Sequence, residues 1–146
     1  MRQALALTLA LVVLAGCGGG GGKALTKQEY ASKADAICSK YNQKIKDLGN
    51  PKNISDLADV ADKTLPLIES AIGEFKKLKP PADEQATASQ WIVQVEGLQT
   101  DLKEVRDKAK AKDLQGVQAV LPRAQQHNAR SNLLATQLGM SVCNSG

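Results

Sequence analysis

The side chains that could do chemistry are few: three cysteines, Cys17, Cys38 and Cys143, and a single histidine, His127. One histidine cannot form a two-histidine zinc site or the Glu-x-x-His pairs of di-iron bundles, and the cysteines form no Cys-x-x-Cys pair and no haem attachment motif. A hydrolytic triad around His127 would need a nucleophile and an orienting acid, and nothing in the sequence marks either. We therefore expect no metal, no other cofactor and no enzymatic activity. His127 is interpreted as a solvated surface residue in the polar stretch 125–128.

The N-terminal stretch 1–16 has the three parts of an export signal. Arg2 supplies a positive start, an apolar segment runs from Ala4 to Ala15, and small residues precede Cys17. The apolar segment is about a dozen residues long, whereas a helix that spans a membrane needs roughly 18 or more. Residues 1–16 are therefore predicted to be a signal peptide and not a permanent membrane span.

Leu14, Ala15, Gly16 and Cys17 stand in succession at the end of this segment. Here the chain resembles the bacterial lipoproteins, whose lipobox is a leucine, then small residues, then a cysteine. The resemblance covers the signal and Cys17 only. It implies that Cys17 begins the mature protein, with a diacylglycerol on its sulfur and often a further acyl chain on its amine, which together suffice for stable anchoring. We accordingly expect a lipid-anchored protein of the cell membrane that faces the extracytoplasmic side, with the leaflet left open. The alternative is an ordinary cleaved signal with a stray cysteine nearby.

Gly18–Gly22 follows the lipobox as a run without side chains. Such a run cannot pack and loses the most backbone entropy on ordering, so it is typical of a tether. A phosphate-binding loop is excluded because no Gly-Lys-Ser pattern accompanies it. Residues 17–25 are therefore predicted to be a lipidated cysteine and a Gly-rich tether with a reach on the order of 15 Å.

Residues 26–146 have the length of one small domain and no alternating apolar pattern of the kind a half-buried strand needs. We predict an all-α fold of four helices. Thr26 and Glu29 have the spacing of a capping box, so the first helix is predicted to start at Lys27. Caps for the other three helices are predicted at Ser55, Asp83 and Asp113.

Glycine and proline mark the ends and the interruptions of these helices. The first helix is predicted to end at Gly49 and the fourth at Gly139, where a left-handed cap is expected. Pro66 and Pro122 fall inside the second and fourth helices, where each should produce a kink. The dipeptide Pro80-Pro81 is predicted to stop the second helix.

Short connections between four amphipathic helices predict an up-down-up-down bundle. The tail 139–146 then emerges near the start of the first helix. With Cys17 lipidated, Cys38 and Cys143 remain as an even pair in an exported protein, the setting in which disulfides form and persist. We predict a Cys38–Cys143 disulfide that fastens the tail to the first helix; the alternative is two free thiols.

All four large aromatic residues outside the signal fall on predicted inner faces: Tyr30, Tyr41, Phe75 and Trp91. Core packing is the expected role, because a bundle this poor in aromatics needs its large side chains inside. A small apolar ligand lodged between kinked helices is the alternative. The apolar stripe of the fourth helix is predicted to run through Leu114, Val117, Leu121, Ala124, Asn128, Leu134 and Leu138.

The net charge is mildly positive, at +4. Nucleic acid is excluded as a partner, because the basic residues alternate with acids and aromatic residues for stacking are scarce. A local basic patch is nonetheless predicted at the end of the bundle away from the tether. It is either a solvated helix end or a contact for anionic lipid, cell-wall polymer or an acidic partner. Its predicted members are Lys46, Lys52, Lys108, Lys110 and Lys112.

Two functional hypotheses follow. The first is a non-enzymatic binding or interaction module of the cell envelope, with an unidentified protein or envelope polymer as partner. The second is a carrier of a small apolar ligand in the bundle interior. An enclosed apolar cavity larger than a few methylenes favours the carrier, whereas a filled core with a contiguous exposed apolar patch favours the interaction module.

Overall fold

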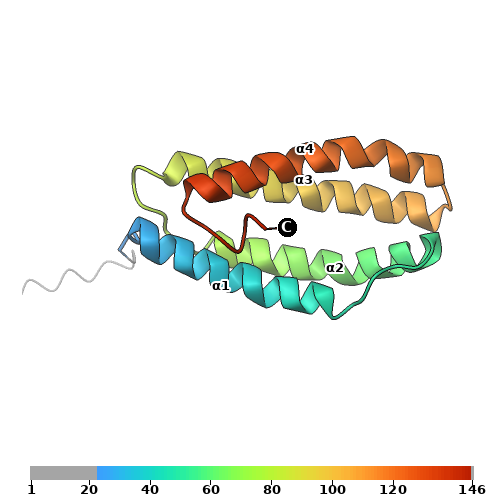
Figure 1. Cartoon of the computed structure of the whole chain (residues 1–146), viewed down its shortest axis with the longest axis horizontal. Coiled ribbons are helices and arrows are strands. Elements are labelled where there is room, and N and C mark those ends of the chain that lie inside the picture. Colours follow the sequence, from blue (N-terminus) through green and yellow to red (C-terminus); the bar gives the residue numbers. More distant parts are fainter. Residues whose placement is uncertain (1–22, 146) are drawn as a thin grey trace, which may run out of the picture.

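The structure is a computed structural model that describes residues 23–145 and consists of four antiparallel helices (Figure 1). The helices are α1 (Lys27–Lys46), α2 (Ile54–Phe75), α3 (Gln85–Lys110) and α4 (Leu114–Gln137), and residues 23–145 contain no strand. The predicted all-α, up-down-up-down bundle is confirmed. The predicted signal peptide 1–16, Cys17 and Gly18–Gly22 lie outside the described residues.

Two of the four predicted helix starts are confirmed. Thr26 and Glu29 form the reciprocal capping box at the start of α1, and the Asp113 carboxylate accepts the Gly116 N–H at the start of α4. The prediction that Ser55 caps α2 is wrong. The cap is Asn53, whose side chain accepts the Asp56 N–H, so α2 starts two residues earlier than predicted. The prediction of Asp83 is also wrong, since α3 follows Glu84 with no side-chain cap.

The predicted end of α4 is confirmed, whereas α1 ends at Lys46, three residues before the predicted Gly49. Gly49 and Gly139 have φ angles of 77° and 78°, the left-handed conformation in which glycine avoids a Cβ clash. Pro66 and Pro122 lie within α2 and α4, and both helices continue through them.

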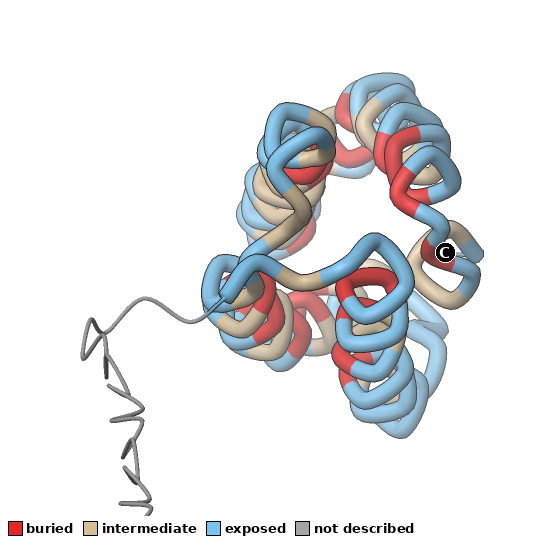
Figure 2. Tube along the Cα trace, turned by 90° about the vertical axis from the view of Figure 1, so that its left-hand side faces the viewer, coloured by how far each residue is buried: buried red, intermediate tan, exposed pale blue. Residues whose placement is uncertain are grey.

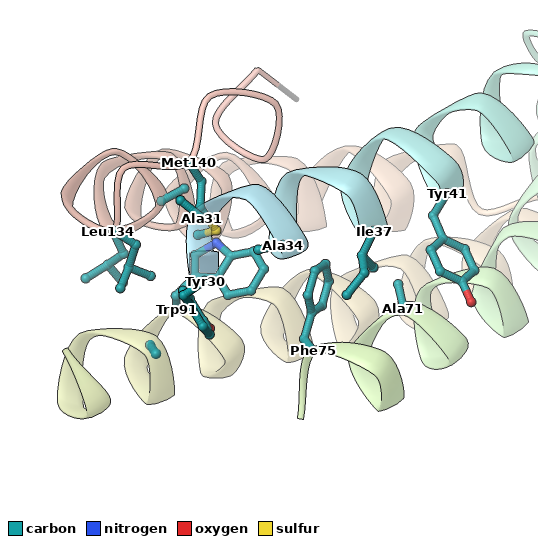
Figure 3. Packing of buried hydrophobic residues seen from close by; sticks show 13 residues of the cluster. Tyr30, Ala31, Ala34, Ile37, Tyr41, Ala71, Phe75, Trp91, Leu134 and Met140 are labelled. Atoms are coloured by element: carbon teal, nitrogen blue, oxygen red, sulfur yellow. The ribbon is translucent and has the colours of Figure 1, made fainter. Parts of the chain in front are cut away.

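The core has two parts, which lie at opposite ends of the bundle. The larger one surrounds Trp91, Tyr30 and Phe75 and takes residues from all four helices (Figure 3). Phe75 and Trp91 meet edge to face with ring centroids 4.7 Å apart, a favourable aromatic geometry. The smaller part comes from α2, α3 and α4 only. All four aromatic residues are buried, as predicted.

The inward face of α4 differs from the predicted stripe. Leu114 and Leu121 are exposed, at 57% and 45%, whereas Val117 and Val120 are buried. Val117 and Val120 lie on the face of α4 that is turned to the core. Leu121 lies about 100° further round the helix than Val120, so it points away from the core. Figure 1 shows that α1 ends before the far tips of α2, α3 and α4, and the smaller core there contains no α1 residue.

The chain after α4 occupies the space between α1 and α4. Figures 1 and 2 show residues 138–145 turning back along the bundle between these two helices. Leu138 and Met140 are fully buried and belong to the larger core. The C-terminal segment therefore closes the part of the α1–α4 interface that lies nearer the start of α1.

Candidate functional site

A disulfide joins the C-terminal segment to α1. The Cys38 and Cys143 sulfurs are bonded, and the two Cα atoms lie 5.4 Å apart. The predicted pairing is confirmed, and it holds the segment against the middle of α1.

Asp35, one turn before Cys38, binds the same segment. Its Oδ1 accepts the N–H groups of Val142 and Cys143 at 2.9 and 3.1 Å, and its Oδ2 accepts the Ser141 N–H and hydroxyl at 2.8 and 2.9 Å. Burial alone would raise the pKa of Asp35, but these hydrogen bonds outweigh burial and lower the pKa below its ordinary value. The segment is thus held by one covalent bond and one charged acceptor.

A pocket of about 210 Å³ lies beside the disulfide in the middle of the bundle. Its walls come from all four helices and from Cys143 of the C-terminal segment, and it is partly open to solvent. Much of the lining is apolar: Ile45 from α1, Ile68, Ala71 and Phe75 from α2, and Trp91, Val95 and Leu98 from α3.

The polar groups of the pocket are concentrated on two helices. Asn128, Ser131 and Asn132 line it from α4, and Ser131 is buried. Across from them, α1 contributes Asn42 and Tyr41, whose hydroxyl donates to Glu74 Oε1 at 2.7 Å. The pocket is therefore apolar toward α2 and α3 and able to form hydrogen bonds toward α4 and α1.

Trp91 has a buried polar atom without a partner. The residue is 1% exposed, and its Nε1 finds no hydrogen-bond acceptor among residues 23–145. A buried donor without an acceptor carries a free-energy cost of about 1–3 kcal/mol. Trp91 is also the only tryptophan in the chain and lines the pocket, so its fluorescence reports on this site.

A second polar cluster lies between α3 and α4, and it corrects the interpretation of His127. Its Nδ1 lies 2.7 Å from Asp101 Oδ2, and its side chain is 30% exposed, so it is a paired residue and not a fully solvated one. Arg123 Nε donates to Asp101 Oδ1 at 2.6 Å, and Asp101 is 2% exposed. Burial alone would raise the pKa of Asp101, but the hydrogen bonds from Arg123 and His127 outweigh it and lower that pKa.

Asp35 and Asp101 were not identified from the sequence. For Asp101 a signal existed, because it stands three residues after Leu98 and four before Val105, which places it on the inward stripe of α3. A carboxylate at such a position needs partners from a neighbouring helix. For Asp35 the three-residue spacing to Cys38 puts both on one side of α1, but its partners depend on where the tail folds.

The predicted basic patch is only partly free. Lys108 lies 3.4 Å from an Asp113 carboxylate oxygen, and Lys110 lies 2.6 Å from one of Asp62. The other three predicted members form no ion pair within residues 23–145: Lys46, Lys52 and Lys112. Lys46 is the last residue of α1, which ends before the far tips of the other three helices (Figure 1).

No group of acidic, histidine or cysteine side chains within residues 23–145 is arranged to hold a metal ion. In that same range, none of the helices combines the length and apolarity needed to cross a bilayer. No protein-family model, curated protein or solved structure is significantly similar to the chain. The function is therefore argued from the pocket and the surface alone.

Proposed function

We propose that this protein is a lipid-anchored, non-catalytic binding protein of the cell envelope. In this proposal the pocket between α1 and α4 carries a small molecule with an apolar body and one polar end. The anchor is Cys17, supported by the lipobox sequence Leu14-Ala15-Gly16-Cys17.

The observation that carries the ligand proposal is the pocket itself. An apolar cavity of about 150 Å³ is large enough to bind benzene, and this pocket measures about 210 Å³. It is smaller than the typical range of about 300–1,000 Å³ for drug-sized ligands. A monocyclic or short branched molecule fits this volume, with its apolar part against Phe75 and Val95 and its polar end toward Ser131.

An interaction module is the second candidate. Leu114 and Leu121 are exposed and stand seven residues apart, which puts them on one side of α4. They offer an apolar contact outside the core. Replacing both with glutamine separates the candidates, because it would weaken a protein partner's binding at this face and leave the pocket unchanged.

Trp91 fluorescence tests the ligand proposal directly. The mature chain is titrated with benzyl alcohol, cyclohexylmethanol and isobutanol, which combine an apolar body with a hydroxyl group. We expect a saturable change in Trp91 emission for at least the cyclic alcohols and a rise in melting temperature, since a ligand that binds only the folded state stabilises it.

The control is a pair of identical substitutions. Ala71→Leu adds three carbon atoms to a buried position of the pocket, whereas Ala119→Leu adds them to an exposed position of α4. Ala71→Leu should abolish the saturable change and Ala119→Leu should preserve it. Equal responses in the two variants, or no saturation in the parent chain, would contradict the proposal.

The anchor is tested separately from the pocket. Cys17→Ser should release the protein from a membrane fraction washed at high salt, with unchanged helical content, because the acyl chains supply the attachment that salt does not screen. Membrane association that persists after this wash, or an unmodified Cys17 by intact mass, would refute the anchor without bearing on the ligand.

A further inference from the structure

A second group of lysines lies at the tethered end of the bundle, opposite the predicted basic patch. Lys23, Lys33, Lys77 and Lys79 surround a shallow depression of about 260 Å³. Leu25 and Leu78 complete its lining. The four lysines come from three separate parts of the chain: the segment before α1, the first turns of α1, and the segment after α2.

These four lysines are exposed and form no ion pair within the part of the chain that the structure describes. The nearest carboxylates already have other partners. Glu29 accepts hydrogen bonds from Thr26 in the capping box, and Glu74 is bound by Lys40 and Tyr41.

Other acidic groups at this end are few. Glu84 is bound to Lys27, and Asp83 precedes it in the connection between α2 and α3. Glu29 lies within electrostatic range of Lys23 and Lys33, and Glu74 within that of Lys77, but none of these pairs is a direct ion pair. At the far end, Lys108 and Lys110 are paired with aspartates, and Lys46, Lys52 and Lys112 form no ion pair within the described residues.

The chain approaches Cys17 from this face. The Leu25 N–H donates to the Lys79 carbonyl at 2.9 Å, which fastens the start of the described chain beside the segment after α2. Figure 2 looks onto this end and shows residues just before α1 crossing from α1 toward the end of α2, with exposed residues dominating the surface. Lys23 stands six positions after Cys17, a separation that spans at most about 22 Å when fully extended.

We propose that this lysine face docks on the anionic phospholipid headgroups of the membrane that holds the anchor. The inference rests on the proposed lipidation of Cys17, because a lipid at that position keeps this face close to a bilayer. Phosphate groups of the lipids supply the negative charges that the four lysines lack, and Leu25 and Leu78 offer apolar contact at the interface. The bundle then stands on its tethered end, and the far-end lysines point away from the membrane.

A vesicle-binding assay tests the docking without the anchor. The mature chain is prepared as Cys17→Ser, so that no acyl chain contributes, and its partitioning is measured on vesicles of phosphatidylcholine alone and of equimolar phosphatidylcholine and phosphatidylglycerol. We expect binding to the anionic vesicles only, and weaker binding at higher salt because screening shortens the reach of the charges.

Two matched triple variants locate the contact. Lys33→Gln, Lys77→Gln and Lys79→Gln together remove three charges from the tethered end. Each lysine near an anionic surface contributes roughly five-fold to partitioning, so their loss should reduce it roughly 100-fold. The same change at Lys46, Lys52 and Lys112 removes three unpaired charges from the far end and should alter partitioning by less than about three-fold.

Each outcome decides the proposal. Equal losses in the two triple variants would show that net charge, and not this face, attracts the chain. Absence of binding to anionic vesicles would overturn the docking even if intact mass shows that Cys17 is lipidated. Competition by soluble glycerol phosphate at millimolar concentration would also overturn it, because it would show a site for a single phosphate and not a membrane surface. An unmodified Cys17 with normal vesicle binding would refute the anchor alone.

Discussion

Removing the Cys38–Cys143 disulfide is the most informative perturbation of the fold, because its cost can be worked out from the chain. The bond closes a loop with a sequence separation of 105 residues. Restricting a loop of this size in the unfolded chain corresponds to about 4.7 kcal/mol in the chain-entropy description. For a domain of this length, that loss lowers the melting temperature by roughly 15–20 °C.

The folded state should survive the change. Leu138 and Met140 keep the C-terminal segment in the core, and Asp35 still binds its backbone. Cys38→Ala, Cys143→Ala and the double variant should therefore remain helical and lose equal amounts of stability, since each removes the same covalent link. Urea unfolding followed by far-UV circular dichroism measures all three free energies of unfolding.

The non-additivity of the pair is the decisive readout. The double variant should be no less stable than either single variant, within about 0.5 kcal/mol. A double variant that loses the sum of the two single losses would refute the covalent link and show two independent packing contributions. A reducing agent should destabilise the parent chain by a similar amount and leave the variants unchanged.

Two further predictions concern the buried carboxylates. Asp35→Asn should destabilise the domain by about 1–3 kcal/mol at neutral pH. The pKa of Asp35 is lower in the folded protein than its ordinary value. The difference in unfolding free energy between the parent and the variant should therefore persist above about pH 4 and shrink as the pH falls below it. Urea-unfolding midpoints across a pH series measure this, and a difference that grows in acid would contradict it. Asp101→Asn should also cost about 1–3 kcal/mol, because the amide keeps one acceptor oxygen for the two donors Arg123 and His127 and carries no charge. Asp107→Asn on the exposed side of α3 should change thermal stability little, and equal losses would refute the role assigned to the α3–α4 cluster.

Local signals in the sequence were sufficient to predict the four helices of this fold. The capping box at Thr26, the glycines at 49 and 139 and the cap at Asp113 act through the residues next to them, so their effect is written in the local sequence. The wrong caps, Ser55 and Asp83, have a local cause as well. Asn53 stands two residues before Ser55 and competes for the same free N–H groups, and Glu84 takes the N-cap position without a side-chain hydrogen bond.

The disulfide was predictable because only one pairing is left once Cys17 is assigned to the lipid. The predicted topology also allows the pairing, because an antiparallel fourth helix brings the C-terminal tail back toward the start of α1, within reach of Cys38. By contrast, the partners of Asp35 and Asp101 come from residues more than twenty positions away. No local pattern specifies which of several neighbouring side chains meets a buried carboxylate.

The sequence by itself determined the helices, their order, the burial of the aromatic residues and the cysteine pair, because each depends on periodicity, capping or elimination. Only the tertiary structure decided where the core stays open and which lysines are free of acidic partners. The pocket exists because α1 and α4 are separated by a segment that fills part of their interface and leaves the rest. The lysine face exists because three distant segments meet at the tethered end. Both are consequences of how elements pack, and a one-dimensional pattern does not contain the distances between them.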